Sequence, residues 1–176
     1  RAIMTSRAAF LPLSGDPFVA LLSIKMWQRW ENEVDRLYIN YNNHAGVSQE
    51  VVAEFLSRVS ENPKIHIIYH PTGIEQGTAL VEMTLIAREE LVMFIEEDFY
   101  IFNSGVVDGY FKKIESGEVD LVGSARYSYG EVGDSAKNKY SLDYSGVGDK
   151  GFAWWPSGFY CRKSDLLKTD LNFGSK

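Results

Sequence analysis

One segment near the middle of the chain reads Leu91-Val92-Met93-Phe94-Ile95-Glu96-Glu97-Asp98, with five apolar residues followed directly by three carboxylates. An apolar run without a polar position is typical of a strand that is covered on both faces, as central strands of parallel sheets are. We therefore expect a buried strand over residues 91–95. This strand would deliver the three carboxylates together to one edge of a sheet.

Short apolar segments alternate with amphipathic ones on both sides of this strand. Further strands are predicted at residues 8–13, 36–41, 65–69 and 121–125, and the aromatic segment 151–161 favours another. Helices are predicted to start at residues 17, 48, about 75 and 106, and a short one is predicted to be capped by Ser164. This alternation favours an α/β fold with a doubly wound, mostly parallel central sheet and helices on both faces.

The first predicted helix has a clear start and an apolar face. Asp16 is a suitable N-cap and Pro17 suits the first helical position. The spacing predicts a core-facing side made of Phe18, Leu21, Leu22, Met26 and Trp30, and we assign Trp27 and Trp30 to packing.

The chain length suits one domain over residues 1–176, which is either whole or truncated at its C-terminus. Within it, residues 127–150 are rich in Gly, Ser, Asp and Lys, which predicts a long mobile loop.

Composition excludes several classes of function. The net charge is -6 and no basic stripe is present, which argues against nucleic-acid binding. No apolar run is long enough to span a bilayer, and we find no secretory signal. Cys161 is the only cysteine, so neither an intrachain disulfide nor a thiolate zinc site can form, and a cytoplasmic location is the simplest expectation. Binding of a single nucleotide is still compatible with the negative net charge, because one metal ion and backbone N–H groups can neutralise a diphosphate.

Ligands of open parallel sheets bind beyond the carboxyl ends of the strands, which here selects the loops after Leu13, Tyr41 and Ile95. The three adjacent carboxylates after Ile95 repel one another unless solvent or a cation compensates, and their oxygens suit Mg²⁺ or Mn²⁺. The alternative is a solvated strand end, or a cap for the following helix. Their place after a fully apolar strand favours metal binding.

These segments together resemble a known family. Residues 93–98 look like the Asp-any-Asp motif of the GT-A glycosyltransferases, particularly the family 2-like enzymes, with Glu in place of the first Asp. Residues 10–18 are similar to the first strand and nucleotide-binding loop of that family, and residues 37–43 resemble its second strand. The resemblance extends from about Ala8 to about Asp170 and rests mainly on the order and spacing of the motifs.

The resemblance implies roles for named residues. Asp98 would bind a Mn²⁺ or Mg²⁺ ion that bridges the diphosphate, Glu96 would reach that ion through water or contact the ribose, and Glu97 would point aside. Other residues would contact the donor: Leu11, Pro12 and Leu13 around base and ribose, Asn40 or Asn42 at the base, and Gln76 and Gly77 beside the phosphates. Simple turn chemistry explains the two asparagines equally well.

The acceptor side and the catalytic base are also implied by the resemblance. Trp154 and Trp155 would stack on sugar rings, although either could instead fill the core. Asp170 would be the base, with Asp165 as a weaker choice because it also suits the first turn of a helix. His44, His66 and His70 show no ligand spacing, and we interpret them as structural.

The implied reaction is transfer of a sugar from a nucleoside diphosphate sugar to a hydroxyl of a carbohydrate or other acceptor, dependent on a metal and inverting. A sugar-phosphate nucleotidyltransferase is one alternative, but it would need a Gly-rich basic loop, and residues 13–17 contain no Lys or Arg. The other alternative is a degenerate, non-catalytic GT-A-like domain used for binding or assembly.

Overall fold

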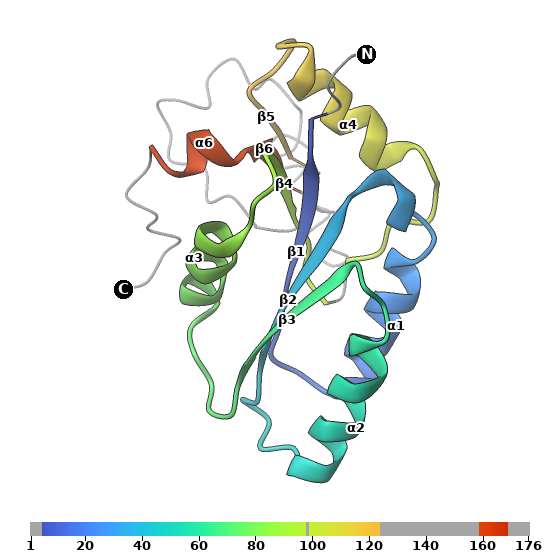
Figure 1. The fold of residues 1–176 in the computed structure, drawn as a ribbon, viewed down its shortest axis with the longest axis vertical. Coiled ribbons are helices and arrows are strands. Elements are labelled where there is room, and N and C mark those ends of the chain that lie inside the picture. The colour runs from blue at the N-terminus through green and yellow to red at the C-terminus, as the bar shows by residue number, and fades with distance from the viewer. Residues whose placement is uncertain (1–4, 98, 124–158, 169–176) are drawn as a thin grey trace, which may run out of the picture.

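The computed structural model describes residues 5–97, 99–123 and 159–168. They form a six-stranded sheet in the order β3-β2-β1-β4-β6-β5, with helices packed against it (Figure 1). The strands are β1 (Arg7–Leu13), β2 (Arg36–Asn42), β3 (Ile65–His70), β4 (Leu91–Phe94), β5 (Leu121–Gly123) and β6 (Phe159–Arg162). The predicted α/β class is therefore confirmed.

The sheet is mostly parallel. Strand β1 pairs in parallel with β2 on one side and with β4 on the other, and β2 pairs in parallel with β3. Only β6 runs the other way among these strands, since it pairs antiparallel with both β4 and β5. Strand order reverses between β1 and β4, which is where a ligand crevice is expected in a doubly wound sheet.

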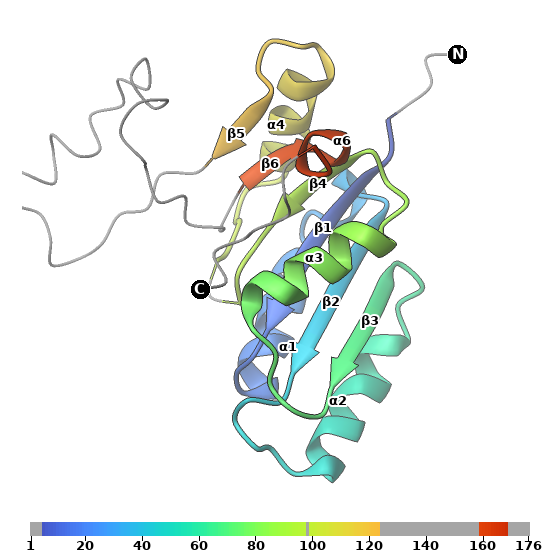
Figure 2. The same cartoon turned by 90° about the vertical axis from the view of Figure 1, so that its left-hand side faces the viewer.

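Helices cover both faces of the sheet (Figure 2). On one face lie α1 (Pro17–Trp27), α2 (Gln49–Ser60) and α4 (Val106–Glu115), and on the other lie α3 (Gln76–Ile86) and α6 (Lys163–Leu166). The short 3-10 helix Glu31–Glu33 precedes β2. Each face has its own apolar core: Trp27, Phe55 and Phe111 belong to the first, and Met83 and Phe94 to the second.

Strand β4 is buried at every position, as the sequence predicted, and Ile95 after it is buried too. Leu91 and Met93 contact the core under α1, α2 and α4, while Val92 and Phe94 contact the core under α3. No helix within the described residues is long and apolar enough to cross a membrane.

Helix α1 starts as predicted but buries a different face. The Asp16 side chain accepts a hydrogen bond from the Phe18 N–H at 2.8 Å, and Pro17 is the first helical residue. However, Phe18 is 75% exposed and Leu22 is 48% exposed, so the predicted core-facing side is wrong at these two residues. Leu21 packs against the core, and the assignment of Trp27 and Trp30 to packing is confirmed. The buried residues are Pro17, Ala20, Ser23, Ile24 and Trp27. The helix is apolar around most of its circumference, and the side with the small residues Ala20 and Ser23 packs inward.

Two predicted helix ends had different outcomes. Helix α4 ends before Gly117, as expected: this residue adopts a φ of 74°, and its N–H donates to the Ile114 carbonyl at 3.1 Å. Ser164 does not cap α6, because the helix already starts at Lys163 and its N-cap is Arg162.

The two faces of α1 differ in what they contribute to stability. Ile24→Ala should lower the free energy of unfolding by about 2–5 kcal/mol, because Ile24 is only 5% exposed and its removal leaves a cavity. Leu22→Ala removes an isomeric side chain from the exposed face and should cost less than about 1 kcal/mol. Denaturation in urea measures both. Equal losses would contradict the observed orientation of α1.

Candidate functional site

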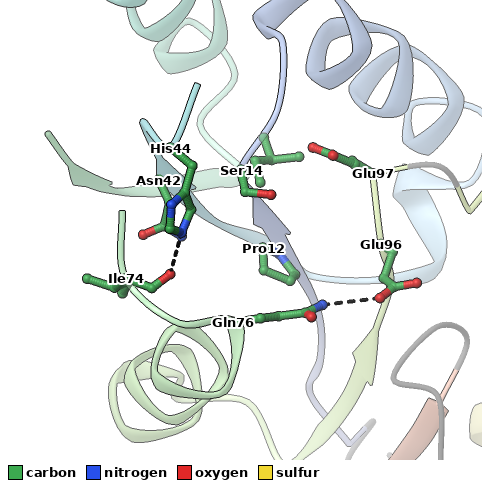
Figure 3. A pocket seen from close by; sticks show the side chains of 9 residues that line it. Pro12, Ser14, Asn42, His44, Ile74, Gln76, Glu96 and Glu97 are labelled. Atoms are coloured by element: carbon green, nitrogen blue, oxygen red, sulfur yellow. Dashed lines mark hydrogen bonds between the residues drawn. The ribbon is translucent and has the colours of Figure 1, made fainter. Parts of the chain in front are cut away.

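A pocket of about 260 Å³ lies beyond the carboxyl ends of β1, β2 and β4, next to the start of α3 (Figure 3). Four segments that are distant in sequence therefore meet at the edge of the sheet where the strand order reverses. The residues that line the pocket are Pro12, Leu13, Ser14, Asn42, His44, Ile74, Gln76, Glu96 and Glu97.

Glu96 and Gln76 meet on one side of this pocket. The Gln76 side-chain amide donates to Glu96 Oε1 at 3.2 Å, which joins the start of α3 to the end of β4. Gly77, the next residue in α3, is not among those that line the pocket. Glu96 is half-buried, as expected for a group at the mouth of a crevice.

Glu97 does not point aside as the sequence analysis expected. Its carboxylate lines the pocket and accepts a hydrogen bond from the Gly15 N–H at 3.3 Å. A Cβ atom on Gly15 would lie 2.8 Å from Glu97 Oε1, so the missing side chain at Gly15 makes this approach possible. The Ser23 hydroxyl also bonds the Glu97 main-chain carbonyl, which attaches the loop after β4 to α1.

The end of β1 contributes two of its three predicted residues. Pro12 and Leu13 line the pocket, whereas Leu11 is fully buried in the core under α1 and α2 and is not part of the lining. Strand residues alternate between faces, but only the last two reach the edge of the sheet where the pocket opens.

The end of β2 contributes Asn42 directly and Asn40 indirectly. Asn42 lines the pocket, while Asn40 is fully buried behind it. Asn42 Nδ2 donates to Asn40 Oδ1 at 3.1 Å, and Asn40 Nδ2 donates to Glu82 Oε2 at 2.8 Å. His70 Nε2 lies 2.8 Å from the same Glu82 oxygen. The two asparagines thus belong to a polar network that spans β2, β3 and α3.

The three histidines differ in their surroundings. His44, which we interpreted as structural, lines the pocket, and its Nε2 lies 2.9 Å from the Ile74 carbonyl oxygen (Figure 3). His66 packs against the Tyr38 ring with centroids 5.3 Å apart. Ser14, His44 and Ile74 are lining residues that the sequence analysis missed. The signal for two of them was available, because Ser14 directly follows β1 and His44 lies two residues after the end of β2.

The pocket is acidic. Two carboxylates line it, and none of its described lining residues is Lys or Arg. Nearby, burial raises the pKa of Tyr41, and the negative charge of Asp16 and Glu97 contributes to that increase after the neighbouring Tyr69. An anionic ligand would therefore need a cation to enter this pocket.

The donor atoms fit Mn²⁺ or Mg²⁺, which prefer carboxylate oxygens over nitrogen or sulfur ligands. Glu96 and Glu97 supply such oxygens at one pocket. Within residues 5–97, 99–123 and 159–168 no group of three or more His, Cys, Asp or Glu side chains is close enough to hold a metal. Asp98, the predicted metal ligand, lies outside the described residues.

Other predicted residues lie elsewhere. Trp154, Trp155, Asp170 and the segment 127–150 are outside the described residues. Asp165 is in α6 and pairs with Lys168 at 2.7 Å. Because Arg162 pairs with Leu91 in the β4–β6 register, α6 starts at the amino end of β4, opposite the pocket. This position argues against Asp165 as a base for chemistry at Glu96.

Comparisons with known proteins find similarity to solved structures only. No protein-family model matches the chain, and no curated protein matches it in sequence. The mannosyltransferase PcManGT from Pyrobaculum calidifontis, in complex with GDP-Man and Mn²⁺, is similar at 10% identity with a TM-score of 0.58, over 72% of this chain and 37% of that one. TarS 1-349 from S. aureus in complex with UDP-GlcNAc is similar at 12% identity with a TM-score of 0.64, over 93% of this chain and 47% of that one.

The chain therefore has a GT-A-like glycosyltransferase fold, as its sequence motifs suggested. Identities this low establish the fold alone. The chain spans less than half the length of both of these structures, and it spans 48% of TarS 1-349 in complex with UDP.

Cys161 should be chemically inert in the folded chain. It is buried in β6, and burial raises the pKa of its thiol to about 12, so the nucleophilic thiolate is scarce near neutral pH. A thiol reagent such as DTNB at pH 8 should not react with the native chain and should titrate one thiol after unfolding in guanidinium. Rapid reaction of the native chain would contradict the placement of Cys161.

Proposed function

We propose that this chain binds a nucleoside diphosphate sugar together with a divalent cation and transfers the sugar to an acceptor hydroxyl. The observation that carries the proposal is the acidic pocket at the strand-order reversal, where Leu13, Asn42 and Glu96 meet. The GT-A-like fold supports it, because similar structures hold GDP-Man with Mn²⁺ and UDP-GlcNAc.

The pocket offers different chemistry at its two ends (Figure 3). The base and ribose would lie against Pro12, Leu13 and Asn42, where apolar surface meets one amide. The diphosphate would lie towards Glu96 and Gln76, with Gly77 in the first turn of α3, whose free N–H groups favour negative charge. At about 260 Å³ the pocket is below the usual range of about 300–1,000 Å³ for ligand sites, so it would hold only part of the donor.

Glu96 and Asp98 would hold the cation, with Glu97 beside them. A diphosphate next to these carboxylates is repelled unless a cation lies between them, which is why we propose Mn²⁺ or Mg²⁺ as a cofactor. When bound, such an ion would stabilise the negative charge on the departing diphosphate.

The transfer itself would be a displacement at the anomeric carbon. The acceptor oxygen forms a bond to that carbon, the bond to the diphosphate oxygen breaks with its electron pair, and a carboxylate takes the hydroxyl proton, giving inversion. Asp170 remains our proposal for this base, and Trp154 and Trp155 for the acceptor contacts. We also propose that residues 1–176 belong to one domain and that it works in the cytoplasm.

The two alternatives make different demands on the same pocket. A sugar-phosphate nucleotidyltransferase would have to bind a triphosphate, and the loop over residues 13–17 offers Ser14 and Gly15 but no cationic side chain. A binding or assembly domain without catalysis would not need a nucleotide at all. Calorimetry with UDP, GDP and Mn²⁺ separates a nucleotide-binding enzyme from an assembly domain, because a chain that binds no nucleotide would favour the assembly role.

Glu96→Gln should weaken Mn²⁺-dependent binding of UDP or GDP about tenfold or more, because the neutral amide is a poorer metal ligand. Glu90→Gln is a matched control, since Glu90 is an exposed carboxylate just before β4, at the opposite edge of the sheet. Isothermal titration calorimetry with and without EDTA measures both variants. Unchanged affinity in Glu96→Gln, or full affinity of the parent chain in EDTA, would contradict the proposed metal site.

A further inference from the structure

The polar network behind the pocket fixes the direction of two side-chain amides. A carboxylate can only accept hydrogen bonds. Because Glu82 Oε2 lies 2.8 Å from the Asn40 amide, Asn40 must turn its NH₂ group towards Glu82. His70 Nε2, 2.8 Å from the same oxygen, must likewise carry a proton.

The direction of Asn40 then determines that of Asn42. With its NH₂ group held by Glu82, Asn40 turns its carbonyl oxygen to Asn42, and a carbonyl oxygen only accepts. Asn42 Nδ2 lies 3.1 Å from this oxygen and 3.4 Å from the Asn40 main-chain oxygen. Asn42 therefore donates to Asn40, and its own side-chain oxygen is turned away from the network.

This oxygen is a buried acceptor that needs a donor. Asn42 Oδ1 has no hydrogen-bond partner within the part of the chain that the structure describes. Asn42 is only 2% exposed, yet it lines the pocket. Buried polar atoms without a partner are uncommon because they cost free energy, so each one needs an explanation. A ligand that brings an N–H group into the base end of the pocket would supply the missing bond.

We propose that this oxygen selects nucleobases whose ring nitrogen carries a hydrogen, and that Glu82 acts as the positioning residue that sets this preference. Uracil and guanine present a ring N–H at the edge that faces such an acceptor. Cytosine and adenine present a bare ring nitrogen there, whose lone pair would face the lone pair of Asn42 Oδ1. The inference rests on the proposed function, because it assigns the base end of the donor to this pocket.

Access to the oxygen requires a small movement. Asn42 Oδ1 is closed to solvent, and His44 is an exposed neighbour that lines the same pocket. The His44 N–H donates to the Asn42 main-chain oxygen at 2.9 Å, and the His44 ring bonds the Ile74 carbonyl and packs closely against Gly73, where a Cβ atom would lie 2.0 Å from the ring. A ligand N–H group would reach the oxygen only if the side of the pocket formed by these residues moves on binding.

The affinities of UDP, CDP, GDP and ADP, measured by calorimetry with Mn²⁺ on the 176-residue chain, test the preference. UDP should bind about tenfold or more tightly than CDP, which has the same ring size and the same diphosphate, because the mismatch leaves buried polar groups unpaired. GDP should exceed ADP if the pocket admits purines. Binding of CDP as tight as that of UDP overturns the inference and leaves the proposed function standing. Absence of binding by all four nucleotides overturns the nucleotide site and this inference with it.

Two variants test the network. Glu82→Gln keeps the shape but can donate as well as accept, which frees Asn40 and Asn42 to turn over. The ratio of UDP to CDP affinity should then fall to within about threefold of one, a change of preference that mere loosening of the fold would not produce. Glu54→Gln is the matched control, since Glu54 is an exposed glutamate on α2 that pairs with Arg58. A parent-like ratio in Glu82→Gln overturns the positioning role of Glu82.

Asn42→Leu removes the acceptor while keeping a similar volume, and it tests the oxygen directly. UDP affinity should fall to the level of CDP, while CDP affinity changes little. Circular dichroism and thermal unfolding confirm that each variant is folded before its binding is compared. Retention of the UDP preference in folded Asn42→Leu overturns the inference.

Discussion

The site depends on the burial of β4 on both faces of the sheet. Side chains of Leu91 and Met93 enter one core and those of Val92 and Phe94 enter the other, so the strand cannot shift by one residue without exposing apolar surface or burying charge. Parallel pairing with β1 then brings the carboxylates that follow Ile95 next to the loop after Leu13. The position of the acidic pocket is thus a consequence of packing in the two cores.

The edge of the sheet combines two unfavourable features that a ligand would relieve. Glu96 and Glu97 place negative charge at one end of the pocket, and at the other end Asn42 holds a buried acceptor that has no partner among the described residues. A cation relieves the first and an N–H donor relieves the second. A nucleotide with a divalent cation supplies both the cation and the N–H donor. An apolar molecule supplies neither, and a free metal ion supplies only the cation.

Much of the fold could be predicted from the sequence, because apolar runs and helix caps depend on nearby residues. The strand at Leu91 and the start of α1 at Asp16 and Pro17 are examples. The buried face of α1 could not be predicted, since Phe18, Leu22 and Ile24 offer similar apolar surface and only the sheet decides between them.

The candidate site was harder to predict than the fold. Leu13, Asn42, Gln76 and Glu96 could be selected as neighbours because strand ends meet at one edge of a parallel sheet. The network that joins Glu82 and His70 to Asn40 could not be predicted, because its hydrogen bonds connect residues of β2, β3 and α3. The direction of Glu97 depended on the missing side chain of Gly15, which is a detail of packing and not of pattern.

A crystal structure of the chain with Mn²⁺ and UDP or GDP tests the central claim most directly. We expect anomalous density for manganese beside Glu96, with the diphosphate bound to it and the base next to Leu13 and Asn42. Manganese or nucleotide bound only at another surface, with the pocket at Glu96 occupied by water, would contradict the account.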